Sequence, residues 1–172
     1  MTIAIEHFFI FLQISIICLF LSQCGFLFKK IIFVYHDNKN FEENGLFGFI
    51  FIGFIGLTIN FFSPLNLIIN NIIFIIIFFI SFIFNFFNQN KIKLIKKIFC
   101  VSLFCYILLI YSNVNTPDAL LYHLPYSKII NDEKMIIGLV NIHFRFGHIS
   151  IFQYISSFFN NSLFKENGVL IP

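Results

Sequence analysis

The stretch LNLIINNIIFIIIFFISFIFNFF, residues 65–87, decides the fold class of this chain. None of its residues is charged, and an α-helix needs about 20 mostly apolar residues to cross a bilayer. The pair Ser63-Pro64 directly before it is typical of a tight turn. We therefore predict a membrane-spanning helix over residues 65–87 that begins just after a turn.

The composition of the whole chain indicates a membrane protein. Its 172 residues are 59% hydrophobic and 11% charged, whereas soluble domains average about 45–50% apolar and about 25% charged residues. So few charges cannot cover the surface of a water-soluble protein of this size. A soluble enzyme, a disordered tail and a nucleic-acid-binding domain are therefore excluded. The prediction is an all-α, polytopic integral membrane protein, a helical bundle whose main partner is the lipid bilayer.

Other apolar stretches extend this prediction to four spans. A cleaved signal peptide is the rival interpretation of the most N-terminal one, but Glu6 and His7 stand where a basic leader belongs, and the apolar run is too long. The predicted transmembrane helices are residues 7–28, 45–62, 65–87 and 98–114.

Small residues within these spans predict helix packing rather than chemistry. Gly48, Gly53 and Gly56 in the second span allow a neighbouring helix to approach closely. The four cysteines lie in hydrophobic stretches without the spacing or the histidine neighbours of a zinc site. We therefore predict small buried side chains here and no metal site.

The positions of the lysines predict the topology. Both clusters, after the first span and before the fourth, read as cytoplasmic under the positive-inside rule. The N-terminus and everything from residue 115 onward are then extracytoplasmic, and the protein is placed in the inner (plasma) membrane as a multi-pass protein. The lysines concerned are Lys29, Lys30, Lys39, Lys91, Lys93, Lys96 and Lys97.

From residue 115 the composition becomes polar. Residues 115–167 are expected to form an extracytoplasmic loop with short helices, in which residues 149–164 lie as a helix at the membrane surface. Residues 168–172 are apolar again and are expected to begin a truncated fifth span. The sequence is accordingly interpreted as an N-terminal fragment of a longer protein.

Asp118 is the first candidate for chemistry in this loop. Thr116 and Pro117 predict the start of a helix, which should end near Leu124 because Pro125 disfavours helix at the residue before it. Two interpretations of Asp118 stay open. A carboxylate in a first turn stabilises the helix dipole, whereas a carboxylate held near the bilayer can act as a catalytic group.

Arg145 is the second candidate, within GLVNIHFRFG, residues 138–147. Polar and apolar residues alternate here, which favours an extended strip with two unlike faces. An arginine between two phenylalanines suits the phosphate of a lipid-linked substrate, or its side chain simply extends to the membrane interface. His143 and His148 are metal-ligand candidates, but their spacing favours structural roles.

The segments Asp118…LYHLP and GLVNIHFRFG resemble those of an uncharacterised family of bacterial polytopic membrane proteins. That family looks like the GT-C superfamily of glycosyltransferases, which use polyprenyl-phosphate-linked sugars on the extracytoplasmic face. The resemblance implies that Asp118 is the catalytic residue or helps to position a divalent metal. It implies that Arg145 and Lys128 pair with the donor phosphate, and that His123 and His143 complete the substrate-binding set.

Two functions follow from these observations. The first is an extracytoplasmic glycosyltransferase for envelope glycan synthesis. The alternative is a non-catalytic envelope protein, namely a flippase, a polymer-export partner or a transporter subunit. A transporter should carry polar or ionisable residues in its spans, and Asn60, Asn70 and Asn71 are the candidates.

Overall fold

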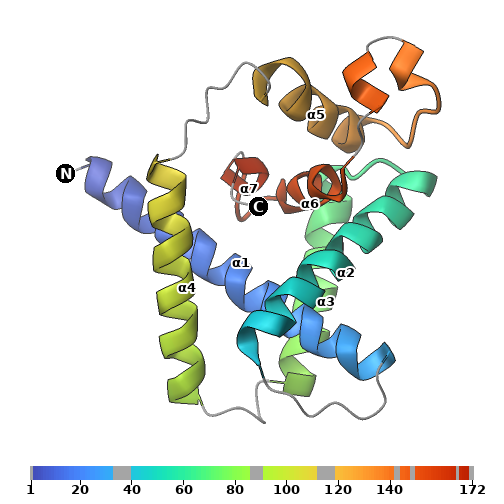
Figure 1. Ribbon diagram of the computed structural model, residues 1–172. Helices are drawn as coiled ribbons and strands as arrows, with labels where there is room; N and C mark the ends of the chain where they lie inside the picture. The colour runs from blue at the N-terminus through green and yellow to red at the C-terminus, as the bar shows by residue number, and fades with distance from the viewer. Residues whose placement is uncertain are drawn as a thin grey trace. The chain divides into compact units, whose positions relative to one another are not determined.

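The computed structural model describes residues 2–32, 40–85, 91–111, 119–141, 144–147, 150–165 and 167–170, and within them the chain is helical without any strand. Four long helices come first and are followed by short helical segments (Figure 1). The long helices are α1 (Thr2–Ile32), α2 (Phe41–Phe62), α3 (Leu67–Asn85) and α4 (Lys91–Tyr111). The short segments are η2 (Ala119–His123), α5 (Leu124–Asp132), η3 (Leu139–Asn141), η4 (Phe144–Gly147), α6 (Ile151–Phe159) and α7 (Asn167–Leu170).

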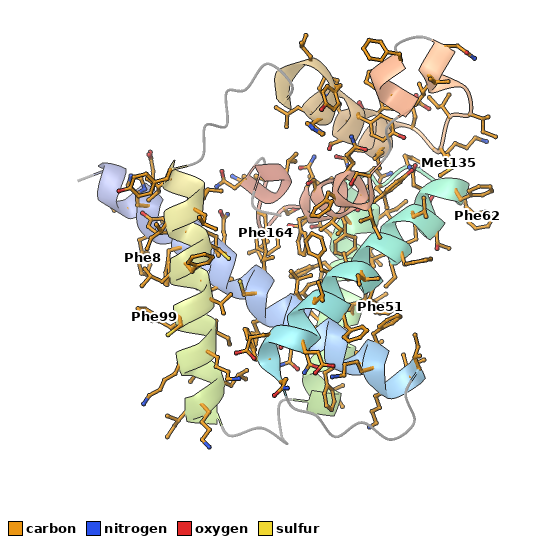
Figure 2. All side chains as sticks on the ribbon, viewed as in Figure 1. Phe8, Phe51, Phe62, Phe99, Met135 and Phe164 are labelled. Carbon is orange, nitrogen blue, oxygen red and sulfur yellow. The ribbon has the colours of Figure 1, made fainter. Side chains whose placement is uncertain are left out.

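The predicted class, an all-α membrane protein, is confirmed. Within the described residues, α1, α2 and α4 are long and apolar enough to cross a bilayer, and α3 contains a shorter apolar run, Leu67–Ile80. Large apolar side chains point away from the helices, among them Phe8, Phe62 and Phe99, which are 62%, 78% and 55% exposed (Figure 2). A surface of this kind is compatible with lipid as the solvent.

The chain forms two compact units, which are described separately. Unit 1 comprises Met1–Phe51 and Phe74–Ser112, and unit 2 comprises Ile52–Ile73 and Asn113–Pro172. Unit 1 therefore holds α1, α4 and parts of α2 and α3. Unit 2 holds the remainder of α2 and α3, which are joined by the Ser63-Pro64 turn, together with the short helices.

In unit 1, α1 and α2 meet backbone to backbone. A Cβ atom on Gly25 would overlap with the carbonyl oxygen of Asn44, and a Cβ atom on Gly48 would overlap with the carbonyl oxygen of Leu21. No side chain larger than hydrogen fits at either glycine without moving a helix. The close approach predicted from Gly48 is confirmed, and Gly25 is its counterpart on α1.

Aromatic rings join α1 to the other helices of unit 1. The Phe11 ring lies 5.7 Å from that of Phe99 and 5.9 Å from that of Tyr106, both on α4. Phe20 stacks on Phe74 of α3 with 4.5 Å between ring centroids. Edge and offset arrangements at these distances add to the free energy gained by burial alone.

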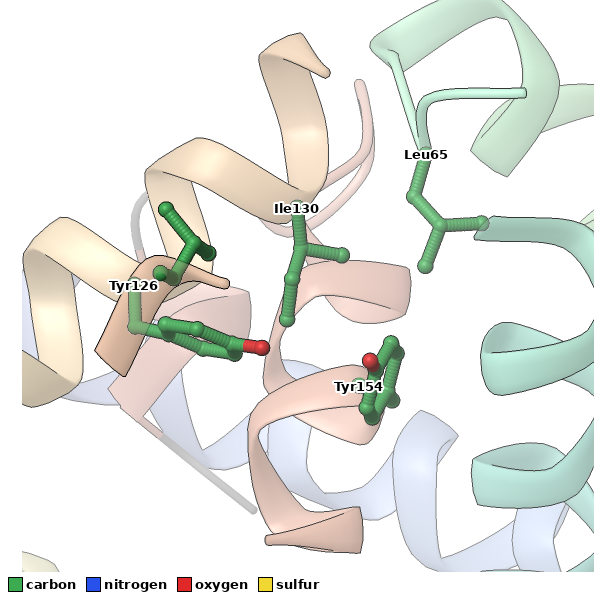
Figure 3. Packing of buried hydrophobic residues seen from close by; sticks show 5 residues of the cluster. Leu65, Tyr126, Ile130 and Tyr154 are labelled. Atoms are coloured by element: carbon green, nitrogen blue, oxygen red, sulfur yellow. The ribbon is translucent and has the colours of Figure 1, made fainter. Parts of the chain in front are cut away.

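In unit 2, the second half of α2 packs against α6. Gly53 faces Ile151, and Gly56 lies against Tyr154. The core of the unit is a cluster of buried side chains, in which the Tyr126 hydroxyl is directed toward Tyr154 (Figure 3). Burial, and then the neighbouring Tyr154, raise the pKa of Tyr126. The members of this cluster are Leu65, Tyr126, Ile130, Leu139 and Tyr154.

Two local expectations are wrong. The helix does not end near Leu124, because Pro125 occupies the first turn of α5, where its missing N–H has no helical partner to lose. The π-helical turn η2 leads directly into it. The extended strip over residues 138–147 is absent from its described part, which forms the 3-10 turns η3 and η4. Alternation over so short a stretch does not distinguish a strand from successive turns packed on one side.

Candidate functional site

Helix α6 begins with a capping box. The Ser150 side chain accepts a hydrogen bond from the backbone N–H of Phe152 at 3.3 Å, and the Gln153 side chain accepts one from the backbone N–H of Ser150 at 3.0 Å. Such reciprocal bonds satisfy N–H groups that a helix start otherwise leaves unpaired. They fix where α6 starts and therefore which of its residues face α5.

Asn70, from the first turn of α3, joins three backbone segments. Its side chain is fully buried. Its amide nitrogen lies 2.8 Å from the carbonyl oxygens of both Leu65 and Ser157, and 3.0 Å from that of Asn160. An asparagine amide has two N–H donors, so the three carbonyls share them. The turn between α2 and α3 is thereby tied to the C-terminal end of α6.

Asn131 of α5 makes a parallel set of bonds. Its amide nitrogen donates to the carbonyl oxygens of Leu65 at 2.7 Å and Ser157 at 3.0 Å. Its side-chain oxygen accepts from the amide of Asn160 at 2.9 Å. Asn131 and Asn70 therefore donate to the same two carbonyls, and Asn160 is held by both.

Asn60, near the end of α2, holds the end of α5. Its amide donates to the carbonyl oxygens of Ile130 at 3.1 Å and Glu133 at 2.9 Å. Its own carbonyl accepts from the backbone N–H of Met135 at 2.8 Å. Asn60 and Asn70, which were candidates for a transport path, are therefore structural links within unit 2.

These links position one side of α5 along an open groove. The groove has a volume of about 530 Å³, and Asn160 and Val169 line it together with α5. The α5 positions are three, four, seven and eight residues apart, which is one helix face. The lining residues are Leu124, Ser127, Lys128, Asn131, Asp132, Asn160 and Val169.

The groove combines charge, hydrogen-bonding groups and apolar surface. Lys128 and Asp132 are exposed and supply an ammonium and a carboxylate. Ser127 and Asn131 are buried, at 4% and 8% exposure, and form its floor. Because Asn131 is fixed by its own hydrogen bonds, the floor is rigid before any ligand arrives, which lowers the entropic cost of binding.

A family model covers nearly all of this architecture. It is described as "Domain of unknown function (DUF8201)" and matches residues 8–171. The chain belongs to the DUF8201 family. The match includes the long helices as well as the short ones, so both belong to the region that the family model covers. No curated protein and no solved structure gives a significant match to this DUF8201 chain.

Of the predicted site residues, Lys128 lies in the groove. His123 is exposed on η2, with its Nδ1 atom 3.5 Å from the side-chain nitrogen of Gln153, and it is not a groove residue. Asp118 and His143 lie outside the described residues. For Arg145 the structure describes the backbone, which belongs to η4.

Segment η4 is anchored away from the groove. Phe146, next to Arg145, contacts Tyr126 with 5.8 Å between ring centroids. Tyr126 and Lys128 are two residues apart on α5 and so project from different sides of the helix. The anchor of η4 is therefore on the core side of α5, and Lys128 is on the groove side.

Apart from Lys128, sequence reasoning missed the groove residues, among them Asp132, Asn131 and Asn160. Asp132 is the last residue of α5 and lines the groove with Lys128. Asp132 follows Lys128 by four residues, a spacing that places both on one helix face. This spacing is the sequence signal that could have identified Asp132. Asn131 and Asn160 carry no such signal, because only the packing of α5 on α6 brings them together.

A three-ligand metal site is not found in the described part of the chain, where His, Cys, Asp and Glu side chains do not gather in groups of three. The resemblance gave Asp118 a possible part in positioning a divalent metal, and His143 was a metal-ligand candidate from its residue type; both lie outside that part.

Proposed function

We propose that this DUF8201 protein is an integral membrane glycosyltransferase that uses a polyprenyl-phosphate-linked sugar on the extracytoplasmic side of the inner membrane, for envelope glycan synthesis. The observation that carries the proposal is the groove along α5. It holds the ammonium of Lys128, the carboxylate of Asp132 and a rigid floor of amide and hydroxyl groups within a domain that also has membrane-spanning helices.

The groove chemistry suits a sugar attached to a phosphate. Sugar hydroxyls both donate and accept hydrogen bonds, and the Asp132 carboxylate together with the Asn160 amide offers acceptors and donors. A phosphate requires a positive charge, which Lys128 supplies as a compact ammonium. Leu124 and Val169 add apolar surface, against which the carbon face of a sugar ring can pack.

The resemblance supplies the remaining roles. Asp118 removes the proton from the acceptor hydroxyl while the acceptor oxygen bonds to the anomeric carbon. The bond from that carbon to the phosphate oxygen breaks, and polyprenyl phosphate leaves with the bonding electrons. Lys128 stabilises the negative charge on the departing phosphate, and Arg145, His123 and His143 bind parts of the substrate that lie outside the groove.

The test uses the complete protein in membranes and an assay of sugar transfer from a polyprenyl-phosphate donor. Lys128→Ala and Asp132→Asn should each lower transfer about 10-fold or more, since hydrogen bonds to charged groups contribute about 1.5–3 kcal/mol. Lys134→Ala is the matched control, because Lys134 is exposed just after α5 and does not line the groove. If both groove variants transfer sugar normally, the groove does not bind the donor and no longer supports the glycosyltransferase proposal.

One observation favours the alternative of a flippase or transporter subunit. Lys29 is 2% exposed, and its ammonium lies 3.0 Å from a carboxylate oxygen of Glu43 within unit 1. Ionisable residues buried among membrane helices often belong to a transport path. Loss of lipid flipping in proteoliposomes by Lys29→Met, with unaltered sugar transfer, would favour this alternative.

A further inference from the structure

We propose that one end of unit 1, formed by the C-terminal end of α1 and the starts of α2 and α4, binds the headgroup of an anionic phospholipid, whose acyl chains lie along the exposed apolar surface at the start of α4. The proposal is independent of glycosyl transfer. It concerns a different unit of the protein and a ligand that the chain meets in its own membrane.

Two ion pairs bring the three helix ends together. Lys29 near the end of α1 pairs with Glu43 of α2 at 3.0 Å. Lys97 of α4 pairs with Glu42 of α2 at 3.1 Å. The first turn of α2 is therefore the common partner of α1 and α4, and its two glutamates are both engaged by lysines.

Positive charge exceeds negative charge at this end. Five lysines with described side chains face two glutamates, a net charge of +3: Lys29, Lys30, Lys93, Lys96 and Lys97 against Glu42 and Glu43. Lys30, Lys93 and Lys96 are exposed. A region with this excess attracts anions, and a phosphate group of a lipid is the anion that a membrane supplies.

The lysines of α4 stand at the unfavourable end of their helix. The first turn of α4 contains no acidic residue, although the N-terminal end of a helix carries partial positive charge and favours anions. Lys93 and Lys96, three residues apart, are neighbours on the helix surface and repel each other. An anion bound beside them would relieve both the repulsion and the unfavourable interaction with the dipole.

Exposed apolar side chains next to the lysines indicate a lipid rather than a soluble phosphate. Ile92 and Ile95 are 69% and 65% exposed, and they lie beside the lysines in the first turns of α4. The same helix surface thus offers ammonium groups for a headgroup and, directly beside them, apolar surface for acyl chains. A phospholipid has a charged phosphate and, next to it, apolar acyl chains, so it matches both parts of this surface. Inorganic phosphate matches only the lysines.

The experiment measures lipid binding to the full chain in detergent by native mass spectrometry. Phosphatidylglycerol and phosphatidylcholine with identical acyl chains serve as probes. The wild-type protein should retain phosphatidylglycerol preferentially, and the preference should shrink as ionic strength rises. Lys93→Ser combined with Lys96→Ser should lower it about 25-fold, at about fivefold for each lysine near a lipid surface.

Lys134→Ser combined with Lys165→Ser is the matched control, because it removes two exposed lysines of unit 2 and should leave the preference unchanged. Equal retention of the two lipids by wild-type protein would overturn the proposal. An equal loss in the control variant, or displacement of the lipid by millimolar inorganic phosphate, would overturn it as well.

Discussion

Replacing Asn70 by alanine removes the amide that joins the α2–α3 turn to the end of α6. Of its three carbonyl acceptors, those of Leu65 and Ser157 keep a donor, because the Asn131 amide also reaches them. The Asn160 carbonyl loses the Asn70 donor. Asn160 is only part-buried, so its carbonyl can bond to water in the variant. We expect Asn70→Ala to lower the free energy of unfolding by about 0.5–1.5 kcal/mol, the net contribution of one hydrogen bond.

Because Asn70 and Asn131 donate to the same carbonyls, the stability effects of replacing them should not be additive. In Asn131→Ala the Leu65 carbonyl still accepts from Asn70 at 2.8 Å, whereas the double variant removes both amide donors to a fully buried residue. The double variant should therefore be less stable than the sum of the single effects by about 1 kcal/mol, within the range seen for residues of one network.

The assay is unfolding of the purified protein in mixed micelles titrated with SDS, followed by circular dichroism. Asn71→Ala is the control, because Asn71 carries the same side chain one residue further on. It forms hydrogen bonds only at the exposed surface in the described structure, with Ser162 at 2.8 and 3.0 Å. Additive single effects, within about 0.5 kcal/mol, would refute the shared-carbonyl argument.

Other predictions concern the helix crossing, the topology and Asp118. Gly25→Ala should lower the amount of folded protein by forcing a methyl group into the α2 backbone, while Gly45→Ala should not, since nothing lies within 4 Å of its Cβ position; immunoblotting of membrane fractions compares them. A reporter fused after Lys97 should be cytoplasmic and one fused after Asn131 extracytoplasmic; the reverse result would reject extracytoplasmic chemistry. Asp118→Asn should lower sugar transfer about 10²–10⁴-fold if the carboxylate is the base, and normal transfer in an abundant variant would leave it a helix-start residue.

Hydropathy predicted where the long helices lie but not where they begin. The second span was predicted from residue 45, whereas α2 starts at Phe41. Its first turn contains Glu42 and Glu43, which end the apolar pattern but favour a helix start through the dipole. Helix α4 likewise begins at Lys91 rather than at 98, although its first turn has no acidic residue to favour a helix start. The length of the apolar stretch gives only the part of a helix that can lie in lipid. Polar turns can extend the helix beyond that part.

The candidate groove was only partly predictable. Lys128 was assigned to the donor phosphate through the family resemblance, and the structure places it in the groove. Asn160 and Val169 join it only through the contacts of α6 and α7, and no periodicity in the sequence specifies these long-range contacts. The capping box of Ser150 and Gln153 is a local sequence motif, and it would have predicted the start of α6.

The Leu65 carbonyl, which accepts from both Asn70 and Asn131, bears on how the chain assembles during synthesis. The ribosome makes the α2–α3 turn before α5 and α6, so this acceptor is already present when the later helices emerge. Segments from the N-terminal side of a growing chain generally fold first. The turn is therefore a preformed surface against which the short helices fold. A fault in inserting α2 or α3 into the membrane would leave α5 and α6 without that surface.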